Sequence, residues 1–100
     1  GMLSTIYIET KKGIPLNKIY KCLKKYHKKN YFVKIMPINR KLGTENVLNT
    51  NFCEISICRS NIKNKLIILS AIDNLIKGAA GQAVQNMNLV FGYNEKLGLN

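Results

Sequence analysis

The chain has 100 residues, of which 46% are hydrophobic, and it carries a formal net charge of +11 at pH 7. This length and this composition fit one globular domain and exclude a wholly disordered chain. No apolar run approaches the roughly 20 residues that cross a bilayer, and the first residues lack the pattern of a secretion signal, so we expect a cytoplasmic protein.

Residues 1–37 predict a strand, a helix and a second strand. Residues 3–9 (LSTIYIE) are rich in β-branched and aromatic side chains, and a turn at residues 11–13 follows. Pro15 suits the first turn of a helix, where its missing N–H breaks no hydrogen bond. Residues 31–36 (YFVKIM) predict a strand that Pro37 stops. The helix carries one apolar stripe, which we expect to be buried, and an opposite face of lysines: Leu16, Ile19, Tyr20, Leu23 and Tyr26 or His27 against Lys18, Lys21, Lys25 and Lys28.

The middle of the chain predicts a loop followed by a hairpin. Residues 38–50 hold Asn, Gly, Lys and Thr without periodicity, so we expect a loop. Residues 52–58 alternate, with Cys53, Ile55 and Ile57 on one face and Glu54 and Ser56 on the other. A polar turn at residues 60–64 leads to a strand at residues 65–72, which should pair with the preceding strand as an antiparallel hairpin.

The last predicted element is a helix. Asp73 or Asn74 is its natural N-cap, and Gly78 predicts that the regular helix begins a few residues later. Gly92 ends it as a left-handed cap. Its apolar stripe consists of Ala80, Val84, Met87 and Phe91. The predicted order is β-α-β-β-β-α, an α+β fold with helices packed on a mainly antiparallel sheet.

The stretch from Gly78 to Gly81 concentrates small residues at the start of this helix. Helices open in this way where another backbone or a flat ligand comes very close. Free N–H groups and a partial positive charge there can receive a phosphate, a carboxamide or a developing oxyanion. The stretch is not the dinucleotide fingerprint GxGxxG, and a tight helix–helix or helix–strand contact uses the same residues. The pattern alone leaves both interpretations open.

Possible nucleophiles and bases are scattered along the chain. Cys22, Cys53 and Cys58 make an odd number, as expected of free thiols in a reducing compartment, and Cys53 and Cys58 should lie on opposite faces of one strand. His27 is the only histidine and has no acidic residue close to it in the sequence. We therefore expect packed thiols, a structural histidine, no metal site and no catalytic constellation within these residues.

The positive charge has two interpretations. Arg40 and Arg59 are the only arginines among 16 basic residues, although arginine dominates bidentate contacts to phosphate and guanine. Lys, Asn and Ile are all abundant and share A/T-rich codons, so the base composition of the genome alone could raise the number of lysines. This favours a solvated basic surface over a nucleic-acid site. The alternative is a stand-alone basic module that binds nucleic acid, whose affinity would fall steeply with salt. Against a nucleic-acid partner, the aromatic residues are spread along the sequence rather than grouped for base stacking.

Four segments resemble N-acetyl-gamma-glutamyl-phosphate reductases, in the order of that family. Residues 70–92 (SAIDNLIKGAAGQAVQNMNLVFG) are similar to the family's C-terminal signature, and residues 81–82 and 85–88 distinguish it from the related motif of aspartate-semialdehyde dehydrogenases. Residues 3–7, 31–37 and 51–54 resemble three upstream elements, so the resemblance covers nearly the whole chain. At residues 48–50, Leu-Asn-Thr replaces a frequent Arg-Gly-Ser, and no arginine role is expected there.

The resemblance implies that residues 1–100 are the C-terminal part of the catalytic, dimerisation domain of an NADP-dependent reductase. In that family a cysteine thiolate attacks an acyl phosphate, hydride from NADPH reduces the thioester, and a histidine handles protons. Cys53 and His27 do not match those positions, so the chain alone is expected to be inactive. The implied substrate is N-acetyl-glutamyl 5-phosphate, a small molecule of arginine biosynthesis.

The resemblance also implies partners for this chain. The final helix would pack against the Rossmann domain of the same enzyme and line the nicotinamide end of the NADP site. The residues on the cofactor side would be Gly78, Ala79, Gly81 and Gln82, with Gln82 as the polar contact. The enzyme would be a homo-oligomer. Without the Rossmann domain the helix would expose its close-packing face, so we expect self-association or low stability of the chain alone.

Overall fold

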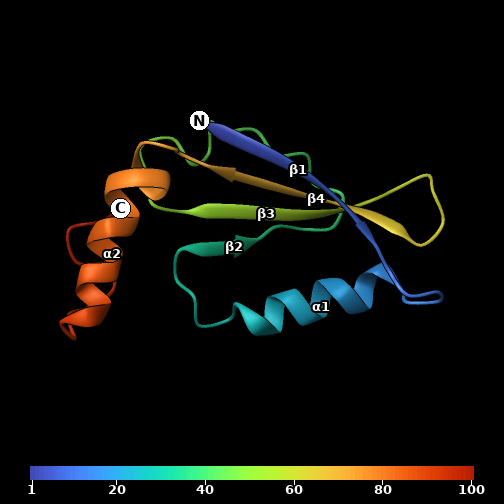
Figure 1. The fold of residues 1–100 in the computed structure, drawn as a ribbon, viewed down its shortest axis with the longest axis horizontal. Helices are drawn as coiled ribbons and strands as arrows, with labels where there is room; N and C mark the ends of the chain where they lie inside the picture. The colour runs from blue at the N-terminus through green and yellow to red at the C-terminus, as the bar shows by residue number, and fades with distance from the viewer.

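The computed structural model describes all 100 residues and contains one sheet of four strands, two α-helices and one π-helical turn. The strands are β1 (Met2–Glu9), β2 (Val33–Ile35), β3 (Cys53–Arg59) and β4 (Lys65–Ile72). The helices are α1 (Leu16–Tyr26) and α2 (Gly81–Val90), and the π-helical turn η1 (Ile76–Ala80) leads directly into α2. The predicted α+β class and the order of the elements are confirmed (Figure 1).

The sheet is mixed, with the strand order β1-β4-β3-β2. Strands β3 and β4 form the predicted antiparallel hairpin, and β1 pairs with β4 in the antiparallel sense along its whole length. Strand β2 runs parallel to β3 over three residues, so the sheet is mainly, though not purely, antiparallel. β2 is shorter than predicted because the N–H of Val33 donates to the carbonyl of Asn30 at 3.1 Å, which holds Tyr31 and Phe32 in a turn.

Helix α1 presents its apolar stripe to the sheet without burying it. Its stripe is half-buried at every position up to His27, while Tyr26 is 77% exposed, so His27 and not Tyr26 completes the stripe. No residue of α1 is fully buried, contrary to our expectation, because the helix runs along the β2 side of the sheet and leaves the strands beyond it uncovered (Figure 1). The predicted lysine face is exposed throughout.

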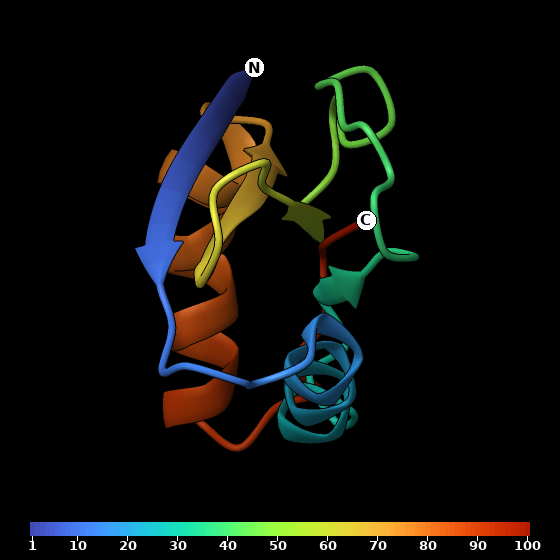
Figure 2. The same cartoon turned by 90° about the vertical axis from the view of Figure 1, so that its right-hand side faces the viewer.

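The two faces of the sheet are covered in different ways. On one face, residues 38–50 lie against β3: the hydroxyl of Ser56 donates to the carbonyl of Arg40 at 2.6 Å, and the N–H of Arg59 donates to Asn39 Oδ1 at 2.9 Å. Figure 2 shows this loop on the side of the sheet away from α1. Glu54 and Ser56, which the alternation assigned to this face, are therefore buried beneath a loop.

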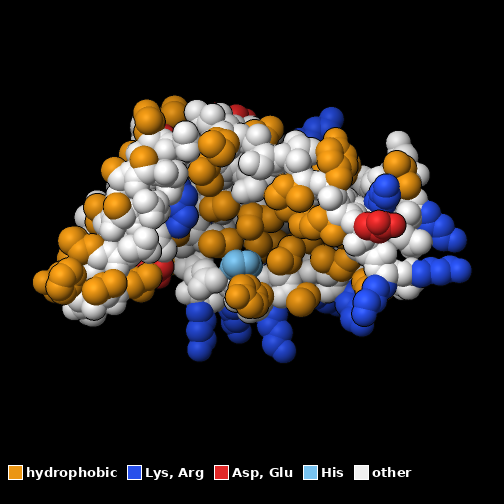
Figure 3. Space-filling view, viewed as in Figure 1, with side chains coloured by type: hydrophobic (Ala, Val, Ile, Leu, Met, Phe, Trp, Pro, Cys, Tyr) orange, Lys and Arg blue, Asp and Glu red, His pale blue; other side chains and the backbone are white.

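The face toward α1 is apolar and partly open. The strand register places one set of side chains on it, which we call the apolar sheet face: Met2, Ile6, Ile8, Ile68 and Ile72. Met2 and Ile6 are each 43% exposed, and the other three are half-buried. Figure 3 shows a hydrophobic area in the middle of the molecule, between α1 and α2. The fully buried apolar core is small, consisting of Phe32, Val47, Ile57, Leu66 and Ala71.

The predicted stripe of α2 is wrong. Met87 and Phe91 are 46% and 67% exposed, and of that stripe only Val84 is partly covered. The buried positions of this helix are Gly81 and Asn88. Each buried position thus lies one residue after a position of the predicted stripe. The reason is that small and polar residues make the contacts of α2 with the rest of this chain. Apolar side chains point outward instead.

Candidate functional site

Asp73 organises the connection between β4 and α2. One carboxylate oxygen accepts the N–H of Asn49 at 2.8 Å and the other accepts the N–H of Leu75 at 2.9 Å. The two bonds, the one from Asn49 first, lower the pKa of Asp73 below its ordinary value although burial acts in the opposite direction. Asp73 thus bonds the turn that precedes η1 and ties it to the loop before β3. The predicted N-cap at Asp73 or Asn74 is wrong, because Leu75 occupies the N-cap position of η1 and no side chain caps it.

The π-helical turn uses the N–H groups that the sequence led us to expect free. The N–H of Gly78 donates to the carbonyl of Asp73 at 3.2 Å, that of Ala80 donates to Leu75 at 3.4 Å, and that of Gly81 donates to Ile76. The π-helical pattern bonds each N–H five residues back, so the turn closes without leaving these donors unpaired. The expectation of a free anion-binding helix start is therefore wrong for these three residues.

Gly81 is in close contact with its own chain. A Cβ on Gly81 would lie 2.6 Å from the carbonyl oxygen of Ile76 and would also collide with Oδ1 of Asn51. Asn51 is fully buried, and its Oδ1 has no hydrogen-bond partner. The absence of a side chain at Gly81 is therefore required by an internal contact between α2 and Asn51, in the loop before β3. Tight packing, the second interpretation of the small residues, holds for Gly81.

The other predicted cofactor residues lie on the outside. Gly78, Ala79 and Gln82 are exposed, while Gly81 is buried, so the four do not share one surface. The amide of Gln82 is held within the helix: its Nε2 donates to the carbonyl of Ala79 at 3.1 Å, and its Oε1 accepts from Asn86 Nδ2 at 3.0 Å. At Gly78 and Ala79 the backbone is exposed and carries no side chain larger than a methyl group. The hydrogen-bonded amide of Gln82 lies one turn further along the chain.

A polar network holds α2 in place. Gln85 is its centre: its Oε1 accepts from Asn51 Nδ2 at 2.9 Å and from Lys77 Nζ at 2.7 Å, and its Nε2 donates to Glu95 Oε2 at 2.7 Å. Residues from the loop before β3, from η1, from α2 and from the C-terminal tail therefore meet at one side chain. Sequence reasoning did not assign this role, although Asn51 and Gln85 both belong to the segments that carried the family resemblance.

Asn88 performs the same task at the other end of α2. It is fully buried, and its Nδ2 donates to the carbonyls of Glu95 and Leu97 at 3.1 and 2.9 Å. Gly92 turns the chain back with a φ of +72°, and the N–H of Tyr93 donates to the carbonyl of Asn88 at 2.8 Å. The predicted left-handed cap is confirmed. The returning tail borders a cavity of about 230 Å³ that Ala80, Gly81 and Val84 also line.

Three aromatic rings are grouped, against our expectation of dispersed aromatics. The ring centroids of Tyr31, Phe32 and Phe52 lie 5.0 to 5.4 Å apart. Lysine amino groups stand over them: Lys34 lies 4.0 Å from the centroid of Phe52, and Lys96 lies 4.4 Å from that of Tyr31. Phe32 is also buried. These rings pack against one another and against lysines of the same chain, and of the three only Tyr31, at 48%, is exposed, so they do not form an open platform for stacking bases.

The thiols and the histidine do not meet. Cys53 Sγ lies 3.4 Å from Ser70 Oγ, and Cys58 borders Ser56. Cys22 is exposed on α1, so the expectation of a packed thiol is wrong for this residue. His27 Nδ1 lies 2.9 Å from Asn30 Nδ2, a local contact at the end of α1. No group of three or more His, Cys, Asp or Glu side chains is arranged to hold a metal ion. No helix combines the length and the hydropathy that a membrane crossing needs.

Comparison with known proteins identifies one family and one group of relatives. Residues 1–74 match the family described as "Semialdehyde dehydrogenase, dimerisation domain". Three curated relatives are named N-acetyl-gamma-glutamyl-phosphate reductase: 46% identical over 100 residues in Clostridium botulinum (strain Eklund 17B / Type B), 48% over 99 residues in Clostridium kluyveri (strain ATCC 8527), and 50% over 99 residues in Vesicomyosocius okutanii (strain HA).

The matches cover 99 to 100% of this chain but only 28 to 29% of each relative. The aligned part is the C-terminal part of those proteins. More than two thirds of each relative thus has no counterpart among these 100 residues.

Proposed function

Because the chain belongs to the semialdehyde dehydrogenase dimerisation-domain family, we propose that it acts as the C-terminal part of an N-acetyl-gamma-glutamyl-phosphate reductase. The observation that carries the proposal is the near-complete match of this chain to the C-terminal part of reductases at 46 to 50% identity. The reaction of the whole enzyme is the NADPH-dependent reduction of N-acetyl-glutamyl 5-phosphate to the semialdehyde, a cytoplasmic step of arginine biosynthesis.

The arrangement of the reactive side chains in this chain favours a structural rather than a catalytic role. Its thiols and its histidine are not arranged as nucleophile and base, so the residues that attack the acyl phosphate and move protons belong to the remainder of the enzyme. Residues 1–100 supply a four-stranded sheet and α2. The open apolar sheet face and the outward apolar side chains of α2 supply the surfaces on which the remainder, a Rossmann domain included, and a second subunit pack.

The start of α2 fits the nicotinamide end of NADP better than its phosphates. The N–H groups of Gly78, Ala80 and Gly81 are already used, so they do not bind a phosphate. The exposed backbone at Gly78 and Ala79 permits close approach of a flat ring. The Gln82 amide beside it uses one N–H and one oxygen lone pair within the helix, which leaves one donor and one acceptor for a carboxamide. When bound, the cofactor supplies the hydride. Gly81 does not face the cofactor in this proposal; it lets the helix pack closely against Asn51.

A chimera tests this proposal. In the C. botulinum relative, the aligned 100 residues are replaced by this chain, and NADPH-dependent reduction of N-acetyl-glutamyl phosphate is measured. We expect an active chimera and no turnover by residues 1–100 alone. Within the chimera, Gln82→Ala should raise the KM for NADPH several-fold, by about 1 kcal/mol of lost hydrogen bonding, with Lys28→Gln as a control of no effect.

Two results would overturn the proposal. One is a folded but inactive chimera beside an active parent enzyme. The other is measurable turnover by residues 1–100 on their own. An unchanged KM in the Gln82→Ala chimera would remove Gln82 from the cofactor site and leave the assignment of the whole enzyme intact.

A further inference from the structure

A second hollow lies at the other end of the sheet from α2, where the β3–β4 turn meets the segment between β1 and α1 (Figure 1). Its volume is about 300 Å³, and we call it the hairpin-end pocket. Thr10 joins its two sides, since its N–H and its hydroxyl both donate to the carbonyl of Asn64, at 2.7 and 3.2 Å. Left-handed residues shape both turns, with φ of +82° at Gly13 and +61° at Asn64. Fixed backbone therefore frames the pocket.

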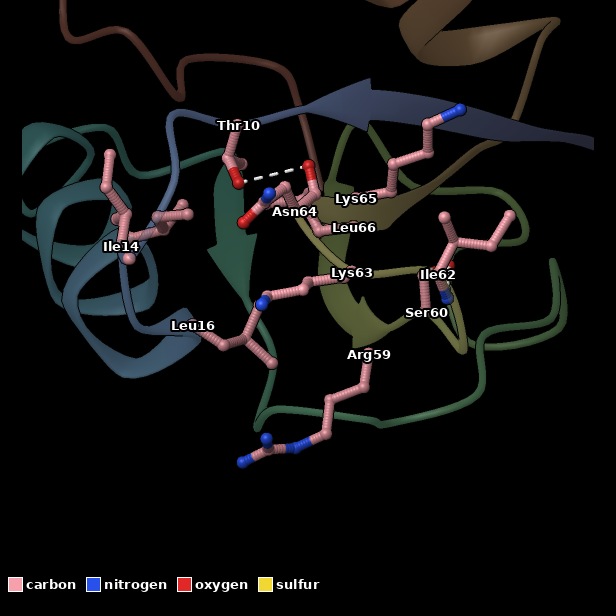
Figure 4. Close-up of a pocket in the computed structure, with 12 residues that line it drawn as sticks. Thr10, Ile14, Leu16, Arg59, Ser60, Ile62, Lys63, Asn64, Lys65 and Leu66 are labelled. Carbon is pink, nitrogen blue, oxygen red and sulfur yellow. Dashed lines mark hydrogen bonds between the residues drawn. The ribbon is translucent and has the colours of Figure 1, made fainter.

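Cationic side chains line the hairpin-end pocket and no carboxylate does. The cations are Arg59, Lys63 and Lys65. Figure 4 shows Lys63 extending across the pocket toward Leu16, and Lys65 turned away from it. Glu9 lies opposite Lys65 in the β1–β4 register, so its charge offsets that lysine. In Figure 4, Arg59 extends below Lys63 at the edge of the pocket, and these two cations are the ones without an opposed carboxylate in the register.

The remaining wall of the pocket is apolar. Ile14, Leu16, Ile19 and Leu66 line it from the link before α1, from α1 and from β4. Ile14 remains 38% exposed, and Ile62 on the turn remains 59% exposed. An inorganic anion alone would leave this apolar wall in contact with water, whereas a ligand with an apolar body would cover it.

We propose that the hairpin-end pocket binds a small molecule that carries a phosphate group on a short apolar body. Arg59 matches phosphate geometry because a guanidinium bonds two oxygens at once, and Lys63 adds a second charge across the pocket. The apolar body rests on Ile14 and Leu16. The pocket lies at the opposite end of the sheet from α2, so this site does not depend on the proposed reductase function (Figure 1).

Calorimetric titration of residues 1–100 with phenyl phosphate and with inorganic phosphate tests the site. We expect saturable binding of phenyl phosphate and about tenfold weaker binding of inorganic phosphate, which lacks the apolar part. Amide NMR shifts should change at Thr10, at Ile14 and over residues 59–66. The double variant Arg59→Gln/Lys63→Gln should weaken phenyl phosphate about tenfold or more.

A matched pair separates the pocket from general charge attraction. Lys21→Gln/Lys25→Gln removes the same charge from the exposed face of α1 and should leave the affinity unchanged. Circular dichroism checks folding, and if the double pocket variant unfolds, Lys63→Gln alone gives the comparison, because Lys63 is exposed in a turn. Equal losses in both pairs, absence of saturable binding, or octathymidylate binding that phenyl phosphate does not displace would overturn the proposal.

Discussion

Gly81 packs against Asn51 where α2 meets the body of the chain. The buried Oδ1 of Asn51 sits where a side chain at position 81 would be, and the carbonyl of Ile76 closes the other side. Gly78, three residues earlier, faces the ends of two side chains, those of Asn74 and Ile72, and no backbone. The two glycines look alike in the sequence, but Gly81 is needed for close packing, whereas Gly78 leaves the backbone exposed.

Replacing Gly81 by Ala should destabilise the fold by about 1–3 kcal/mol, because a methyl group forces backbone and a buried amide apart. Gly78→Ala is the matched control and should be neutral or slightly stabilising, since Ala favours a helical backbone. Urea unfolding of both variants measures the difference. Equal unfolding midpoints would contradict the internal contact at Gly81.

Asp73 should make the fold acid-sensitive. Its pKa is lowered in the folded chain from an ordinary value of 3.8, so it stabilises the fold above that value. The contribution is lost as the pH falls below 3.8 through the lower folded pKa. Asp73→Asn should therefore narrow the difference in stability between about pH 6 and about pH 3, whereas Glu45→Gln, at an exposed position, should not. Urea unfolding midpoints of the parent chain and both variants at the two pH values measure this effect. The same pH dependence of stability in all three proteins would refute this role of Asp73.

At the scale of elements, local patterns predicted the strands and helices well. The alternation of residues 52–58 and the turn at 60–64 predicted the hairpin, and Gly92 predicted the helix end. The burial pattern of α2 was not predictable from apolar periodicity, because Gln85 and Asn88 bind it to its own chain and its apolar side chains point outward. The π-helical turn also left no sequence signal, because it depends on Asp73 bonding residues on both sides.

The C-terminal cap of α2 provides a test at this scale. Gly92 has a φ of +72° and open space where a Cβ would be, so only backbone strain opposes a side chain. Gly92→Ala should cost about 1 kcal/mol of stability, and Gly92→Asn should cost less, because Asn tolerates the left-handed region. Thermal unfolding compares them, and an Ala variant as stable as the parent would rule out this cap as a determinant.

The molecule as a whole is extended and exposes more surface than its mass requires. Its principal extents are 44 × 25 × 18 Å and its accessible surface is 6956 Å², whereas a monomer of its mass exposes about 5,700 Å². Much of the excess is apolar, on the sheet face in Figure 3 and along α2. In soluble proteins, large exposed apolar surfaces mark the sites at which a partner protein packs.

The chain alone should therefore self-associate. Sedimentation velocity at rising concentration should show oligomers, and Met2→Lys/Ile6→Lys should shift the chain toward monomer by placing charge on the apolar sheet face. Tyr26→Lys is the control, since Tyr26 is 77% exposed but lies outside that face. If the parent chain stays monomeric at every concentration, the exposed apolar side chains of the sheet face and α2 do not drive self-association, and the prediction is wrong.

The pairing of β1 with β4 has a consequence for biosynthesis. β1 leaves the ribosome well before β4 (Lys65–Ile72), the strand that completes its hydrogen bonds, because residues 10–64 emerge between them. Closing so long a loop is slow, so the β3–β4 hairpin forms early and β1 joins it late. While residues 10–64 are translated, β1 remains an unpaired, β-branched segment, and we expect chaperone capture and premature aggregation of the nascent chain to begin there.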